Sequence, residues 1–142
     1  MNDILPFLLQ HWMLSTAFVV ILIAIIVVEA RGKVGGAHKV TAEKAVHLMN
    51  RESAVVLDTR DRSNFEKGHI INAVNIMPSE LTAENKQLEK LKNNPIIIVC
   101  ASGSLSPNHA AKLHKLGYPH LHLLAGGMGA WKAANLPTRK GK

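Results

Sequence analysis

A short apolar run that ends in the chain's only cysteine constrains the fold more than any other stretch. Residues 96–99 are three isoleucines and a valine, Pro95 precedes them, and Cys100 follows them directly. Four consecutive apolar residues are typical of a strand that is buried on both faces, as in a parallel sheet. We therefore expect Cys100 at the carboxyl end of a central strand.

A helix is predicted shortly after this cysteine. Ser106 and Pro107 are residue types that favour the cap and the first position of a helix, and Gly117 suits its C-terminal end. The loop before the helix is made of small residues, so its backbone N–H groups can turn inward and cradle an anion. These small residues are Ala101, Ser102, Gly103 and Ser104.

The position of Cys100 predicts a reactive thiol, because the partial positive charge of a helix N-terminus favours the thiolate. A purely structural role stays open, since free cysteines are often simply buried. A single cysteine excludes an internal disulfide and a zinc site made of cysteine pairs, and it fits a reducing compartment.

The first thirty residues differ in composition from the rest of the chain. They contain two charged groups, Asp3 and Glu29, and no lysine or arginine. Residues 12–28 carry no charge, and Ser15 and Thr16 are their only polar members. Such a helix, extended by the apolar residues before it, can cross a bilayer core of about 30 Å. We predict a transmembrane helix within residues 1–30.

Two alternatives to a membrane anchor fit this segment less well. A buried core helix is rarely apolar all round. A cleaved signal peptide needs a basic start and a small-x-small cleavage site, whereas this segment starts with Asp3 and runs into Glu29-Ala-Arg31. The prediction is therefore an uncleaved, single-pass anchor over residues 1–30, followed by a flexible linker over residues 31–39.

All 17 basic residues lie from Arg31 onward, together with 8 acidic ones, which gives that part a net charge of +9. The positive-inside rule then predicts that the C-terminal part is cytoplasmic. The expected partner of the scattered basic residues is the anionic leaflet of the membrane, at about 1 kcal/mol per nearby basic residue. No nucleic-acid partner is expected, because aromatic residues do not interleave with the basic ones.

Helical and strand patterns alternate in the remaining chain. This alternation predicts an α/β fold with a parallel sheet, whose ligands bind beyond the carboxyl ends of the strands, where Asp58 and Cys100 both lie. Helices are expected over residues 42–50, 61–67, 78–92, 106–117 and 126–135, and strands over residues 54–57, 73–76, 96–99 and 121–124.

Several of these segments together resemble the rhodanese-like domain. They are Leu57-Asp-Thr-Arg60, Gly68-His-Ile followed by Ala73-Val-Asn75, Cys100 in its loop, and Gly126-Gly-Met-Gly-Ala-Trp131 followed by Leu136-Pro137. The resemblance covers residues 40–137 and leaves residues 138–142 as a basic tail. It implies a parallel sheet flanked by helices. An anchor before a single such domain is similar to a group of bacterial inner-membrane rhodaneses, which implies an inner-membrane location.

The resemblance also implies a chemistry. Cys100 would take sulfane sulfur from a small-molecule or protein donor as a persulfide and pass it to an external thiol or other nucleophile. Asp58 and Arg60 match the family's Asp-x-Arg motif and would support the site. No cofactor or metal is implied. The backbone amides expected to hold the terminal sulfur are those of Ala101, Ser102, Gly103, Ser104, Leu105 and Ser106.

The loop departs from the family in its charge. Many active rhodaneses carry arginine after the cysteine or a basic residue later in the loop, where this chain has Ala101 and residues 104–106. Thiosulfate is therefore expected to bind weakly, and neutral or protein-borne persulfides become better candidate donors. The missing arginine also argues against phosphatase activity, because nothing in the loop would stabilise phosphoryl transfer. The alternative function is a non-catalytic rhodanese module, tethered to the membrane as a binding or scaffold domain.

Two histidines are candidate metal ligands. His120 and His122 share one face of a predicted strand, but no cysteine or carboxylate lies beside them in the sequence. Solvated side chains are expected rather than a metal site.

Overall fold

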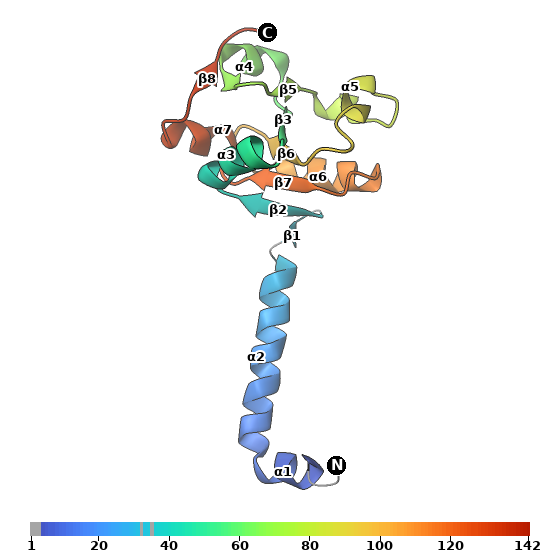
Figure 1. Ribbon diagram of the computed structural model, residues 1–142, viewed down its shortest axis with the longest axis vertical. Helices are drawn as coiled ribbons and strands as arrows, with labels where there is room; N and C mark the ends of the chain where they lie inside the picture. The colour runs from blue at the N-terminus through green and yellow to red at the C-terminus, as the bar shows by residue number, and fades with distance from the viewer. Residues whose placement is uncertain (1–3, 32, 35) are drawn as a thin grey trace. The chain divides into compact units, whose positions relative to one another are not determined.

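The computed structural model describes residues 4–31, 33–34 and 36–142. Contacts divide the chain into two units, Met1–Gly32 and Lys33–Lys142. The first unit consists of α1 (Ile4–Gln10) and α2 (Trp12–Arg31), which appear in blue in Figure 1.

The first unit bears on the predicted transmembrane helix. From Trp12 to Val28, every side chain of α2 except that of Ser15 is exposed. Among the described residues, none of the helices combines the length and the apolarity needed to cross a membrane. The prediction of a transmembrane helix within residues 1–30 is therefore not supported.

The second unit is organised around a six-stranded sheet with the order β1-β2-β7-β6-β3-β5. Strand β1 is antiparallel to β2, and the other neighbouring pairs are parallel, so the predicted α/β class with a parallel sheet is confirmed. The strands are β1 (Lys33–Val34), β2 (Ala37–Val40), β3 (Val55–Asp58), β5 (Val74–Asn75), β6 (Ile96–Val99) and β7 (Leu121–Leu124). A separate antiparallel pair is formed by β4 (His69–Ile70) and β8 (Thr138–Arg139).

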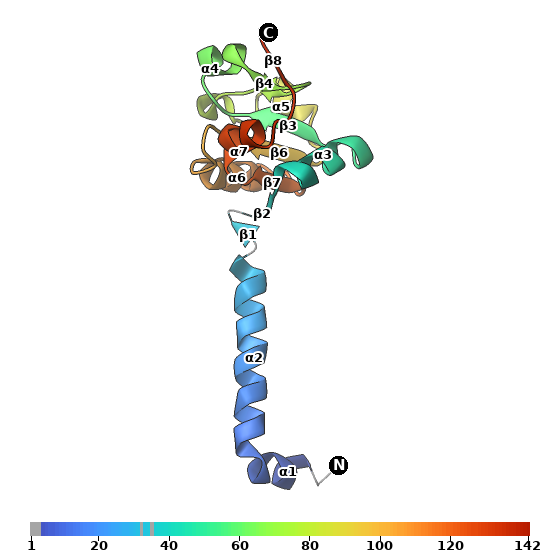
Figure 2. The same cartoon turned by 90° about the vertical axis from the view of Figure 1, so that its left-hand side faces the viewer.

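Helices cover both faces of this sheet (Figures 1 and 2). One apolar cluster joins α5 and α6 to the sheet, with Leu113 and Ile98 among its members. The other joins α3 and α7 to the opposite face, with Trp131 and Ile97 among its members. All four residues of β6 are fully buried, as the apolar run predicted. The helical elements are α3 (Ala42–Arg51), α4 (Arg62–Lys67), the short 3₁₀ helix η1 (Pro78–Glu80), α5 (Lys86–Glu89), α6 (Ser106–Lys115) and α7 (Gly127–Ala133).

The flexible linker predicted over residues 31–39 is wrong from Lys33 onward. Val34 pairs with Ala37, and Gly36 has a φ of +83°. Strand β2 then joins the sheet beside β7. The residues after 137 do not form a simple tail either, because β8 pairs with β4.

The single helix predicted over residues 78–92 is also wrong. The spacing of Leu81 and Leu88 is typical of a helix, and both are fully buried, but they belong to different segments. The Oδ1 atom of Asn85 accepts the backbone N–H groups of Gln87 and Leu88 at 2.9 and 3.3 Å. An asparagine that satisfies these donors starts a new helix, so α5 begins at Lys86 and is separate from η1.

Candidate active site around Cys100

Cys100 lies at the carboxyl edge of the parallel sheet, directly after β6. Asp58 reaches the same edge, because it pairs with Val99 in the register between β3 and β6. The shared position of Asp58 and Cys100 is therefore as predicted. Cys100 is 4% exposed, so its environment is set by the loop that follows it.

The loop directs a backbone N–H group at the cysteine sulfur. The Gly103 N–H donates to Cys100 Sγ at 2.9 Å. Gly103 has a φ of +84°, a left-handed conformation that glycine adopts without strain, and a Cβ atom there would lie 3.0 Å from Gly126 N. The sulfur thus contacts a hydrogen-bond donor, as a loop that cradles an anion requires.

These donors favour the ionised thiol. Burial raises the pKa of Cys100, but the Ser106 hydroxyl and the N–H groups of Leu105, Ser106 and Gly103 outweigh it, so the pKa of the thiol is lower than usual. The Ser106 hydroxyl is fully buried and has no ordinary hydrogen-bond partner in the described part of the chain. No other group of the described residues therefore competes with the Cys100 sulfur for the Ser106 hydroxyl. Ser106 was predicted to cap α6, but Leu105 holds the cap position and Ser106 is the first helical residue.

Helix α7 holds the backbone at the start of the loop by hydrogen bonds to its carbonyl oxygens. The Met128 N–H donates to the carbonyl oxygen of Cys100 at 2.9 Å, and the Gly129 N–H donates to that of Ala101 at 3.2 Å. Gly127, just before them, has a φ of +57°, and a Cβ atom there would overlap the Cys100 carbonyl oxygen. The backbone at the start of α7 is thus part of the support on which the loop rests.

The remaining loop residues face other groups. The hydroxyls of Ser102 and Ser104 are hydrogen-bonded to each other at 2.9 Å. The side chain of Leu105 is 57% exposed. Of the six residues expected to line the site, Gly103, Leu105 and Ser106 act on the sulfur through their donor groups.

We predict that Ser106→Ala shifts the pH dependence of sulfur transfer by Cys100 upward. The thiolate form of Cys100 is the nucleophile. The rate of sulfur transfer therefore rises with pH through the lowered pKa of this thiol and is constant above it. Without the Ser106 hydroxyl, the pKa rises and the midpoint of the rate profile moves to higher pH. Rates measured across the pH range check this. Ser102→Ala is the matched control, and equal midpoints for both variants would contradict the role of Ser106.

Asp58 and Arg60 form a buried ion pair rather than a part of the loop. Arg60 Nη2 lies 2.7 Å from Asp58 Oδ2, and the same nitrogen donates to the Gly68 carbonyl oxygen at 2.7 Å. The side chain of Asn75 donates to the carbonyl oxygens of Asp58 and Arg60 at 3.1 and 2.9 Å. The pair thus joins the end of β3 to Gly68, just before β4, and the Asn75 side chain joins the same backbone to β5. These contacts favour a structural role for both residues.

A lysine that the sequence analysis placed in the linker lies beside the loop. Lys39, on β2, lines a pocket of about 280 Å³ together with residues 102–104 of the loop and residues 123–126 of the β7–α7 junction. It comes from a strand about 60 positions before the loop and meets it because β2 pairs with β7. The only feature in the sequence that marked Lys39 as a candidate site residue was its charge. The pairing of β2 with β7 is needed to place that charge beside the loop.

The histidines lie at a different pocket, of about 460 Å³. His122 faces His38 across the β2–β7 register, with ring centroids 6.4 Å apart. Burial lowers the pKa of His122. No group of three or more metal-ligating side chains comes together among the described residues. The residues that line this pocket are Gly36, His38, Glu52, His114, Pro119, His120, Leu121 and His122.

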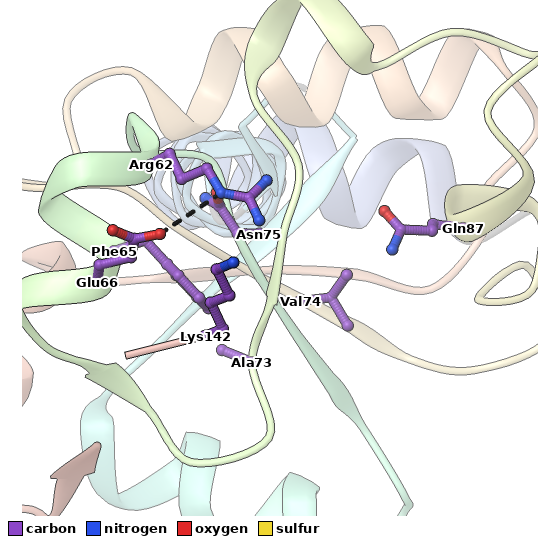
Figure 3. A pocket seen from close by; sticks show the side chains of 8 residues that line it. All are labelled: Arg62, Phe65, Glu66, Ala73, Val74, Asn75, Gln87 and Lys142. Carbon is purple, nitrogen blue, oxygen red and sulfur yellow. Dashed lines mark ion pairs between the residues drawn. The ribbon is translucent and has the colours of Figure 1, made fainter. Parts of the chain in front are cut away.

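A further hollow of about 300 Å³, shown in Figure 3, lies beside α4 and β5. Arg62 Nε is 3.6 Å from Glu66 Oε1 at its rim, and Lys142 points toward the same space. Its other lining residues are Phe65, Ala73, Val74, Asn75 and Gln87. It holds neither the thiol nor a loop residue, so we assign the chemistry to the Cys100 site.

Comparison with known proteins agrees with this geometry. The family model described as "Rhodanese-like domain" matches residues 41–134. The chain is 37% identical to the "Uncharacterized protein YibN" of Escherichia coli K12, over the whole of both chains. It is 30% identical to "Thiosulfate sulfurtransferase GlpE" of Coxiella burnetii, over 63% of this chain and 82% of that protein. A thiosulfate sulfurtransferase structure from Pseudomonas aeruginosa superposes with a TM-score of 0.65 and 29% identity, covering 74% of this chain and 20% of that one.

Proposed function

Because the chain belongs to the rhodanese-like domain family, we propose that it is a sulfurtransferase that carries sulfane sulfur on Cys100 as a persulfide. The observation that carries this proposal is the Gly103 N–H directed at Cys100 Sγ, in a setting that lowers the pKa of the thiol. Two similar proteins named as thiosulfate sulfurtransferases support the same class of reaction.

The proposed reaction has two displacement steps. The Cys100 thiolate attacks the outer sulfur of a donor, a new S–S bond forms, and the donor's remaining group leaves with the electron pair of the broken bond. An external thiolate then attacks the terminal sulfur, and the Cys100 thiolate leaves with its electron pair. Both the thiolate and the persulfide are anions, so the same N–H donors stabilise each of them. The single cysteine means that the acceptor is another molecule.

Mass spectrometry of the intact protein tests the proposal. After incubation with a sulfane-sulfur donor and removal of the excess, the chain should gain the mass of one sulfur atom, located at Cys100 by peptide mapping. A following incubation with a thiol acceptor should remove that mass. No added sulfur with thiosulfate, with a small-molecule persulfide or with a protein persulfide would refute carrier function.

A binding or scaffold role is the second candidate, and one observation favours it. No residue of the loop from Ala101 to Ser106 carries a positive charge, unlike the loops of many active rhodaneses. A scaffold needs the fold but not the thiol. Cells that carry Cys100→Ser in place of the wild type distinguish the two functions, because the scaffold predicts an unchanged phenotype and the sulfurtransferase predicts that of a deletion.

We also propose that the first unit attaches the protein to the inner membrane, with the rhodanese-like domain on the cytoplasmic side. The exposed apolar side chains of α2 and the restriction of basic residues to Arg31 and beyond support this. Full-length protein should sediment with membranes and resist carbonate extraction, and protease added to intact spheroplasts should leave the domain uncut. A variant that begins at Lys33 should be recovered in the supernatant, and recovery of the full-length chain there would contradict the proposal.

A further inference from the structure

We propose that Lys39 is the cation that binds the negatively charged group of an anionic sulfur donor, such as the sulfonate-like end of thiosulfate, beside the Cys100 loop. This inference rests on the proposed sulfurtransferase function and names its class of donor. It replaces the expectation that no cation faces such a donor, because the charge comes from β2 rather than from the loop.

The position of the pocket carries the first step of the argument. Gly103 belongs both to the pocket and to the sulfur site, since its N–H donates to Cys100 Sγ at 2.9 Å. The backbone of Gly103 thus borders both the pocket that Lys39 lines and the nucleophile. We infer that a donor whose charged end lies in this pocket presents its outer sulfur to Cys100 across Gly103.

The charges and donors of the pocket carry the second step. Lys39 is the one charged side chain among the described residues that line it, so no carboxylate opposes an anion. The Ser102 and Ser104 hydroxyls share one hydrogen bond, which uses one of their two hydrogens and leaves the other for a ligand. Leu123 and Leu124, which also line the pocket, are 2% and 1% exposed, so the pocket borders the buried end of β7.

The chemistry of thiosulfate fits this arrangement. When the Cys100 thiolate attacks the outer sulfur, the S–S bond of thiosulfate breaks and the electron pair leaves with sulfite, which is a dianion. The Lys39 ammonium neutralises charge on the bound donor and on the departing sulfite. An uncharged donor has no such group and gains nothing from Lys39.

The experiment compares two donors on the full-length chain. For Lys39→Ala, we expect the KM for thiosulfate to rise about fivefold with kcat unchanged, as for the loss of a solvent-accessible ion pair. The KM for an uncharged organic trisulfide should stay the same, and Lys39→Arg should retain the wild-type KM for thiosulfate. Lys44→Ala is the matched control, because it removes the same charge from an exposed position on α3 outside the pocket.

Thiosulfate binding to Cys100→Ser, measured by calorimetric titration, decides the inference independently of catalysis. Thiosulfate should bind Cys100→Ser about fivefold more tightly than the double variant with Lys39→Ala. Equal binding by the two, or an equal rise in KM for the uncharged trisulfide, would overturn the inference. If no donor transfers sulfur to the wild type but the two binding constants differ as expected, the proposed function fails and the anion site stands.

Discussion

Cys100→Ser is expected to reduce sulfur transfer at least about 10³-fold, from any donor. A serine hydroxyl remains protonated in the pH range where the Cys100 thiol, with its lowered pKa, is ionised, and it cannot carry sulfane sulfur. The N–H group of Gly103 and the support from α7 do not depend on the sulfur atom, so the loop should keep its structure. Initial rates with thiosulfate and with a small persulfide measure the effect.

Ser79→Ala is the control for this loss. It removes a serine hydroxyl from an exposed position on η1, outside the loop and the pocket beside it, and leaves the thiol and its donors in place. Unfolding curves should show that both variants are folded. Substantial transfer by a folded Cys100→Ser protein would mean that another group is the nucleophile, and the site described here would not be the active site.

Arg60→Met is expected to lower the free energy of unfolding by about 3–5 kcal/mol, the usual cost of breaking one side of a buried ion pair. The side chains of Asp58 and Arg60 are 1% and 8% exposed, so the substitution leaves a buried carboxylate without its partner. It also removes the donor to the Gly68 carbonyl oxygen. Urea unfolding of the two proteins, followed by circular dichroism, measures the difference.

Arg62→Met gives the comparison for Arg60→Met. Its partner Glu66 lies one helical turn away at 3.6 Å, and the two side chains are 70% and 43% exposed. Such a surface pair contributes about 0.5 kcal/mol or less. Equal losses for Arg60→Met and Arg62→Met would show that Asp58 and Arg60 contribute little to stability, and a functional role for the pair would then need to be considered.

The sequence predicted the centre of the sheet and the position of the nucleophile well, for a local reason. The four residues of β6 are apolar on both faces, so their burial needs no knowledge of the partners. Cys100 follows the strand directly, and the loop of small residues implies inward N–H groups. The sequence pattern did not predict which donors act on the sulfur, because it assigned the Ser106 hydroxyl to the cap of the helix.

Features that depend on distant pairing were missed. Strand β2 has only four residues with mixed polarity, and its partner β7 lies about 80 positions later, so residues 31–39 were read as a linker. Lys39 was misplaced for the same reason. In residues 78–92, the leucine spacing satisfied a helical pattern, but the side chain of Asn85 competes for backbone donors and divides the segment. Periodicity does not detect such a competition.

The bonds from α7 to the carbonyl oxygens of Cys100 and Ala101 have a consequence for synthesis of the protein. Met128 and Gly129 are made after the cysteine, so a nascent chain that exposes Cys100 on the ribosome still lacks the backbone that shapes the loop. We therefore expect its thiol to keep the acidity of a cysteine in an unfolded peptide until α7 has emerged and packed. The lowered pKa of the thiol is then a property of the completed domain. A prematurely terminated chain that ends before α7 should contain Cys100 but lack this lowered pKa.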